Sequence, residues 1–211
     1  MAEPARTRIA KRRPGRPRQV EPSDAFLARR TEIIATAVEV FRQRGFDQGT
    51  LDDVAASLGT GRASLYHYVG SKPHLLFLIF DRAITSTLAE MDELMTIADP
   101  EQRLRALMRH QVEIITRNPS MFAVFFGDRT ALDEKYESEI RPKERRLLRN
   151  LIETLVAANE AGVVQVGDPR LAAQAILGMT SWIYKWFDPG RDDPDEFVRI
   201  CEQLVFGQPT T

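Results

Sequence analysis

The chain has 211 residues, of which 43% are hydrophobic and 28% are charged, and this composition excludes a fibrous or wholly disordered protein. Its longest apolar run, 75–80, is far shorter than the roughly twenty residues of a membrane-spanning helix, so we expect no membrane span. The single cysteine, Cys201, excludes an internal disulfide. With no secretory leader visible, this predicts a cytoplasmic protein.

Charge is distributed unevenly along the chain. Residues 1–20 hold seven lysines and arginines against Glu3 and carry +6, so the other 191 residues carry −7 to give the net −1. Prolines and a lack of apolar residues predict that 1–23 is a flexible basic arm. Residues 14–17 resemble the Arg-Gly-Arg-Pro core of an AT-hook, with Pro14 in place of the first arginine. We expect DNA groove or phosphate contacts from Arg13, Arg16 and Arg18, unless the arm is only a solubilising tail.

Apolar residues then recur at helical spacing, and no stretch shows the alternation typical of strands. Glycines, prolines and capping residues mark the helix ends. The sequence therefore predicts an all-α fold of about nine helices. The first ends at Gly45, and the others cover about 50–58, 62–68, 72–97, 100–117, 121–127, 133–161, 169–186 and 194–205.

The two short helices after Gly45 have the length and spacing of a helix-turn-helix, with 59–61 as the turn. Thr50 and Asp53 match the capping box that opens a helix. The alternative interpretation is two packed helices of an ordinary bundle.

In the second short helix, Leu65 and Tyr68 are spaced to pack inward. This places four residues on the outer face: Arg62, Ala63, Tyr66 and His67. Their donors suit the phosphates and base edges of DNA, and Lys72 adds a cation at the start of the next helix. The alternative is a solvated surface.

The segment 50–72 resembles the DNA-binding domain of the TetR family of bacterial repressors. The likeness rests on TLDDVAASLG at 50–59, SLYHYV at 64–69 and the pair Ser71-Lys72, and FRQRGF at 41–46 fits it as well. Gly61 and Pro73 stand where the family often has serine and glutamate.

The resemblance implies a ligand-responsive repressor that binds a palindromic operator in double-stranded DNA as a homodimer. It implies a three-helix DNA-binding domain at 24–72 and a helical ligand-binding and dimerisation domain at 73–207. It also implies that Thr50 caps its helix beside a phosphate and that the phosphate backbone is held by Tyr66, His67 and Lys72. The residues expected to face the bases are Thr60, Gly61, Arg62 and Ser64.

The C-terminal half is expected to hold the dimer interface and the effector site. The predicted helix 169–186 is apolar on more than one side, with one stripe formed by Ala172, Ala175, Ile176, Met179, Trp182, Ile183 and Trp186. Together with 197–205 it fits a four-helix interface between two subunits, which the resemblance also implies. The alternative is a core within one subunit.

Aromatic side chains gather at 122–126 and 182–187. They are candidates for lining an apolar tunnel, although packing in the core is the commoner fate of such residues. The candidate ligand-binding residues are Phe122, Phe125, Phe126, Met179, Trp182 and Trp186.

The string 182–190 resembles the C-terminal region of TetR-type regulators of fatty-acid and steroid catabolism, which respond to acyl-CoA thioesters. This favours a small hydrophobic effector such as an acyl-CoA, whose phosphates would meet Arg129, Arg141, Lys143 or Lys185. A regulator of a drug or aromatic-compound operon and an effector-independent DNA-binding protein remain open.

No enzyme motif is present: the sequence has no nucleophile elbow, phosphate-binding loop or dinucleotide fingerprint. His110 and Glu113 have a spacing that metal ligands use, but no second pair accompanies them. We therefore expect no catalysis, no metal and no cofactor.

Deletion of residues 1–20 should flatten the salt dependence of DNA binding. Each phosphate that the arm neutralises contributes about −0.9 to the slope of log K against log salt. Anisotropy titrations at several salt concentrations measure this slope, and an identical slope in both proteins would mean that the arm makes no phosphate contact.

Overall fold

The computed structural model describes residues 23–207. Within this range it contains nine α-helices, two short 3-10 helices and no strand, which confirms the predicted all-α fold. The α-helices are α1 Asp24–Gln48, α2 Leu51–Ser57, α3 Arg62–Val69, α4 Lys72–Leu94, α5 Pro100–Arg117, α6 Pro119–Gly127, α7 Glu134–Glu160, α8 Pro169–Ser181 and α9 Pro194–Phe206. The basic arm, with Arg13, Arg16 and Arg18, lies outside the described residues.

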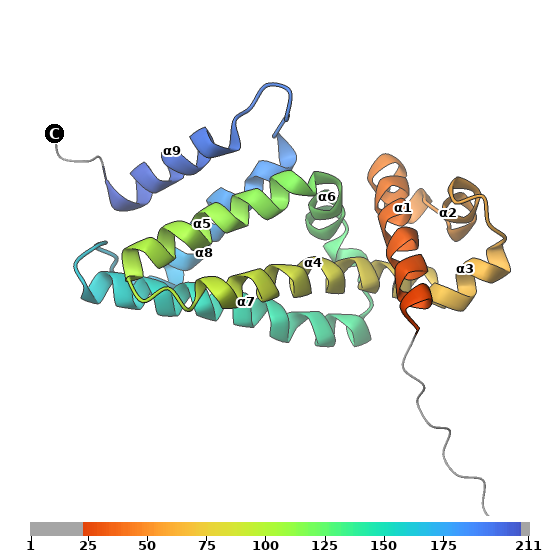
Figure 1. The fold of residues 1–211 in the computed structure, drawn as a ribbon, viewed down its shortest axis with the longest axis horizontal. Coiled ribbons are helices and arrows are strands. Elements are labelled where there is room, and N and C mark those ends of the chain that lie inside the picture. Colours follow the sequence, from red (N-terminus) through yellow and green to blue (C-terminus); the bar gives the residue numbers. More distant parts are fainter. Residues whose placement is uncertain (1–22, 208–211) are drawn as a thin grey trace, which may run out of the picture.

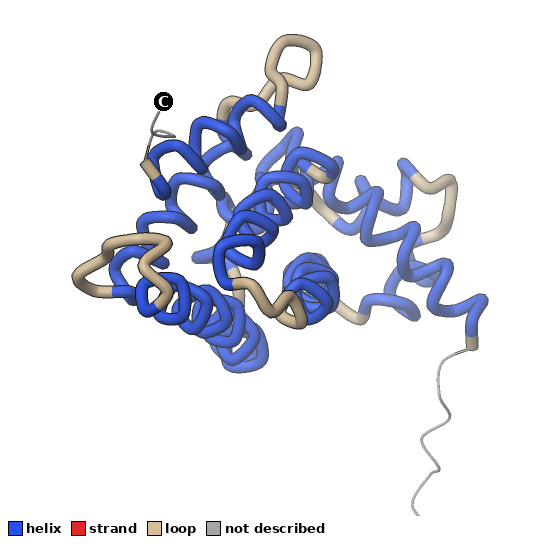
Figure 2. Tube along the Cα trace, turned by 60° about the vertical axis from the view of Figure 1, so that its left-hand side comes forward, coloured by secondary structure: helices blue, strands red, loops and turns tan. Residues whose placement is uncertain are grey.

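The helices form two groups. Helices α1, α2 and α3 lie at one end, and α4 leads from them into the larger group of α4 to α9 (Figure 1). The short helix α6 belongs to the second group but packs more extensively against α1 than against any other helix. Figure 2 shows the same separation from another side. No helix between residues 23 and 207 is long and apolar enough to cross a membrane.

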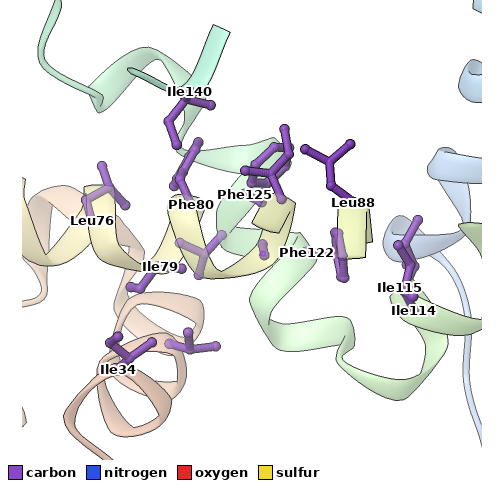
Figure 3. Packing of buried hydrophobic residues seen from close by; sticks show 14 of the residues in the cluster. Ile34, Leu76, Ile79, Phe80, Leu88, Ile114, Ile115, Phe122, Phe125 and Ile140 are labelled. Atoms are coloured by element: carbon purple, nitrogen blue, oxygen red, sulfur yellow. The ribbon is translucent and has the colours of Figure 1, made fainter. Parts of the chain in front are cut away.

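The first half of α4 explains the longest apolar run of the sequence. Every residue in 75–80 is buried: the Phe77 ring stacks on Tyr136 of α7, the Phe80 ring packs against Phe125 of α6, and α4 also contacts α1 and α3. Figure 3 shows Leu76, Ile79 and Phe80 pointing to different sides of the helix. A helix that is apolar all round belongs in a core, and here that core joins the two groups of helices.

Two helices end earlier than the sequence predicts. The helix expected to reach about Trp186 ends at Ser181 and continues as a 3-10 turn, Trp182–Lys185. Tighter 3-10 turns are common at helix ends, and this one changes the directions in which the side chains after Ser181 point. The connecting helix, expected to reach about Ile97, ends at Leu94.

Gly59 should be required for the stability of the turn between α2 and α3. Its φ of 60° lies in the left-handed region, and an added Cβ would have nothing within 4 Å, so Gly59→Ala introduces backbone strain without a clash. The strain is about 1 kcal/mol of unfolding free energy, which urea denaturation at fixed protein concentration measures.

The matched control is Gly127→Ala, at a helical glycine that also has open space around it. We expect unchanged or slightly higher stability there. An equal loss in the two variants would contradict the role of the backbone conformation at Gly59.

Candidate nucleic-acid interface and apolar cavity

Helix α3 packs one face into the core and leaves the opposite, outer face exposed. Leu65 and Val69 are fully buried, and Tyr68 is half-buried with its ring 4.8 Å from that of Phe26. The exposed residues are Gly61, Arg62, Ala63, Ser64, Tyr66 and His67, and Thr60 in the preceding turn is half-buried. The division of α3 that its spacing predicts is therefore confirmed.

The side chain of Arg62 contacts residues of both α2 and α3. Its guanidinium lies 3.0 Å from Asp52 Oδ2 and donates to the Tyr66 hydroxyl at 3.1 Å. These contacts, the Tyr66 hydrogen bond first, raise the pKa of Arg62 above its ordinary value. Both partners of the ion pair are more than half exposed, so the pair is weak and the Arg62 guanidinium can change partners.

Thr50 and Asp53 form the predicted capping box at the start of α2. Asp53 N donates to Thr50 Oγ1 at 3.1 Å, and Thr50 N donates to Asp53 Oδ2 at 2.9 Å. Asp53 Oδ1 also accepts from Arg44 at 2.7 Å, which ties α2 to the end of α1. The capped helix α2 packs against α3.

Lys72 has a position that the sequence did not predict. Its Nζ donates to the carbonyl of Asp47 at 3.1 Å and lies 4.4 Å from the centroid of the Phe46 ring. Lys72 is half-buried, so this cation also fastens the start of α4 to the end of α1.

An apolar cavity of about 270 Å³ lies between α4, α5, α6, α7 and α8. Figure 3 shows Phe122 and Phe125 of α6 among the apolar side chains of α4 and α5. The polar lining residues are few. The full lining is Ile84, Thr87, Gln111, Ile114, Phe122, Phe125, Phe126, Glu144, Leu147, Leu148, Leu177 and Ser181.

Three of the six candidate ligand residues, Phe122, Phe125 and Phe126, line this cavity. The other three lie elsewhere. The Trp182 side chain is 58% exposed, and Trp186 packs edge-on against Phe197 of α9 and is 41% exposed. Met179 is half-buried on α8, outside the lining, because the cavity faces the side of α8 that carries Leu177 and Ser181.

Sequence reasoning missed Gln111, although a signal was present. Gln111 follows Met108 by three residues and precedes Ile115 by four, so it holds a core position on an otherwise apolar face of α5. A polar residue at such a position indicates a special environment, and here that environment is the cavity wall.

An apolar strip of α8 and α9 faces outward. Exposed apolar and small residues recur on α8 at Leu171, Ala175 and Gly178 and continue at Trp182 in the 3-10 turn, and Ile200 and Leu204 are exposed on α9. This surface fits the expected four-helix interface between subunits. The expected stripe was wrong in part, because Ile176 and Ile183 are buried inside the subunit.

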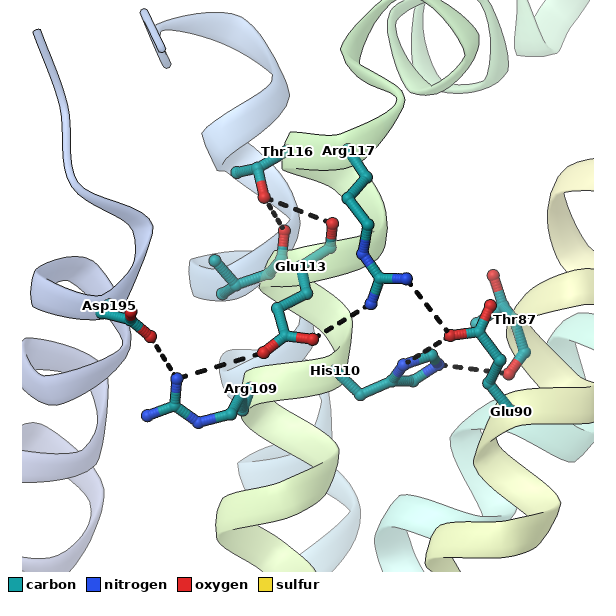
Figure 4. A network of polar contacts seen from close by, with 9 residues as sticks. Thr87, Glu90, Arg109, His110, Glu113, Thr116, Arg117 and Asp195 are labelled. Carbon is teal, nitrogen blue, oxygen red and sulfur yellow. Dashed lines mark hydrogen bonds and ion pairs between the residues drawn. The ribbon is translucent and has the colours of Figure 1, made fainter.

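A network of charged side chains joins α4, α5 and α9 (Figure 4). Glu113 lies 3.0 Å from Arg117, and Arg117 lies 3.8 Å from Glu90 on α4. His110 points to the same Glu90, at 3.5 Å, so His110 and Glu113 do not converge. In the described part of the chain, no three histidine, cysteine or acidic side chains form a metal-like group.

The pKa of Asp53 offers a direct check of the capping box. The Thr50 hydroxyl first, then the Thr50 amide and Arg44, lower it below its ordinary 3.8. The cap is therefore intact above pH 3.8 and is lost as the pH falls through the lower pKa of the folded state. In an NMR titration, Thr50→Ala should raise this pKa more than Arg44→Ala does. An ordinary pKa in the parent protein would contradict the geometry.

Comparisons with known proteins agree with this architecture. Residues 33–79 match the model of bacterial regulatory proteins of the tetR family, and residues 98–208 match the tetracyclin repressor-like C-terminal domain. The chain is 27% identical over 168 residues to the transcriptional repressor KstR2 of Rhodococcus jostii, covering 77% of this chain and 81% of that one. It is 29% identical to the repressor NicS of Pseudomonas putida over a shorter stretch, 45% of each chain.

A solved structure is similar over nearly its whole length. The crystal structure of AibR in complex with isovaleryl coenzyme A and operator DNA has a TM-score of 0.78 and 28% identity, covering 85% of this chain and 98% of that one. The C-terminal match alone spans more than half of the present chain, and the N-terminal match covers the helix-turn-helix. The chain therefore belongs to the TetR family of DNA-binding transcriptional regulators.

Proposed function

We propose that this regulator is a repressor whose hold on its operator is released by an acyl-CoA. The observation that carries the proposal is the apolar cavity, one wall of which is α6, the helix packed against α1. The similarity to AibR, which was crystallised with isovaleryl coenzyme A and operator DNA, supports this class of effector. Residues 24–72 form the DNA-binding unit in this proposal, and 73–207 bind the effector and the second subunit.

The outer face of α3 enters the major groove. Arg62 reaches base edges together with Thr60, Gly61 and Ser64, and the phosphates are held by Thr50, Tyr66, His67 and Lys72. Since operator half-sites are about 34–36 Å apart, the two copies of α3 in the dimer must keep that spacing.

The acyl group fills the cavity, where phenylalanine, leucine and isoleucine side chains replace water around it. Arg129 is the cation best placed to meet the CoA phosphates. It follows α6 directly and pairs at 3.0 Å with Glu144, which lines the cavity. Arg141 pairs with Glu137, which also lies 3.7 Å from Arg129, whereas Lys143 pairs with Asp81 on α4 and Lys185 lies over the Tyr184 ring.

Release follows from the position of α6. A ligand that pushes on Phe122, Phe125 or Phe126 moves the helix that supports α1, and so changes the spacing of the two α3 helices. It can do so only by binding the DNA-incompetent state more tightly than the competent one.

Substitutions on α3 and at the start of α4 should separate base contacts from phosphate contacts. Arg62→Ala should cost about 1–3 kcal/mol of operator binding and relax sequence specificity, whereas Lys72→Ala should lower the salt slope by about one unit. Anisotropy titrations with operator and scrambled DNA measure both effects. The control is Arg191→Ala, at an exposed arginine in the loop before α9. Unchanged operator binding by Arg62→Ala would refute the assignment of α3.

The effector class is tested by titrating the protein–operator complex with short- and medium-chain acyl-CoAs, with free CoA as the ligand control. We expect release by at least one thioester. Leu148→Phe, which fills the cavity, should abolish the response and keep DNA binding. Val156→Phe, on an exposed part of the same helix, should respond normally. If no thioester releases DNA, the acyl-CoA proposal is wrong.

A further inference from the structure

One oxygen in the wall of the cavity has no partner in the described part of the chain. The Gln111 side chain is only 8% exposed, and its Oε1 accepts no hydrogen bond. Its Nε2 donates to Ser181 Oγ at 3.2 Å, which links α5 to α8 within the cavity wall. Both residues belong to the cavity lining.

This oxygen makes the cavity selective. Gln111 Oε1 is already closed to solvent without a ligand, and a buried acceptor without a donor is unfavourable. A wholly apolar ligand leaves this acceptor unpaired, whereas a ligand with a correctly placed donor pairs it and gains binding free energy.

The other polar groups of the lining are already committed. The Thr87 hydroxyl donates to the carbonyl of Ala83 at 2.8 Å, and the Glu144 carboxylate is paired with Arg129. The Ser181 hydroxyl accepts from Gln111, and its own hydrogen donates to no described group. Gln111 and Ser181 thus offer one acceptor and one donor side by side.

The chemistry of this pair matches an alcohol. A hydroxyl group can donate to Gln111 Oε1 and accept from the Ser181 hydroxyl through a single oxygen atom. A plain acyl chain and a thioester contain no donor. In a trans secondary amide, such as those of the pantetheine arm, N–H and C=O point in opposite directions, so neighbouring groups on one wall cannot serve both.

We propose that the effector carries a hydroxyl group on its acyl chain, held by Gln111 and Ser181. This inference rests on the proposed function, in which the cavity receives the acyl part of a CoA thioester. Gln111 is then the residue that determines the preference for a hydroxyacyl group over the unsubstituted chain.

The test uses ligands that differ only in the hydroxyl. Calorimetry of the full-length protein compares hexanoyl-CoA with its 2-, 3- and 6-hydroxy derivatives. At least one derivative should bind about tenfold more tightly than hexanoyl-CoA, the effect of pairing one otherwise unsatisfied buried acceptor. In Gln111→Leu, which removes the acceptor at similar volume, this preference should disappear while hexanoyl-CoA still binds.

Two further variants keep the test decisive. Gln102→Leu, at an exposed glutamine of the same helix, should keep the full preference. Ser181→Ala should reduce the preference, and it replaces Gln111→Leu if thermal unfolding shows that the latter does not fold. Equal binding of hexanoyl-CoA and all its hydroxy derivatives, or a preference that survives in Gln111→Leu, would overturn the inference while leaving the acyl-CoA proposal intact. Failure of every thioester to bind would overturn both.

Discussion

The packing of α6 against α1 is the contact on which the whole account depends. With nine residues, α6 is too short to be stable as an isolated helix, so its neighbours determine where it lies. Its N-terminal end lines a surface groove with Val38 and Glu39 of α1. Its phenylalanines face the cavity on the other side.

The C-terminal end of α6 lies where the end of α1 and the start of α4 are in contact. Burial raises the pKa of Asp128, the residue that follows α6, and nearby Asp47 also raises it, while a hydrogen bond from the Phe46 backbone and the charge of Lys72 act in the opposite direction. Lys72 itself holds α4 to α1 through Asp47 and Phe46. A displacement of α6 therefore reaches the DNA-binding helices at both of its ends. Because binding energies are linked, DNA must weaken effector binding by the same factor by which effector weakens DNA binding.

Local signals in the sequence were enough to predict the helix-turn-helix. The capping box at Thr50, the glycine turn and the inward spacing of Leu65 all act over three or four residues, and the structure has each of them. The ion pair of Arg62 with Asp52 joins two helices, and no local pattern predicts it.

The cavity was harder to predict for the same reason. Periodicity shows which face of a helix is apolar, but not which neighbour covers it. Phe125 was placed in an apolar cluster and lies in one, whereas Trp182 was named both for the effector site and for the subunit interface and lies exposed in the 3-10 turn after α8. The polar exception on α5, Gln111, was visible in the sequence, but only the packing of α8 shows that it meets Ser181.

The central claim is that effector in the cavity changes the spacing of the two DNA-binding domains. Pulsed electron resonance between spin labels at Ala56→Cys in the two subunits measures this spacing directly. Cys201 does not interfere, because burial raises the pKa of its thiol to about 11. We expect an acyl-CoA that releases DNA to shift the distribution of distances between the two labels. An unchanged distribution under conditions in which the same acyl-CoA releases the operator would contradict the claim.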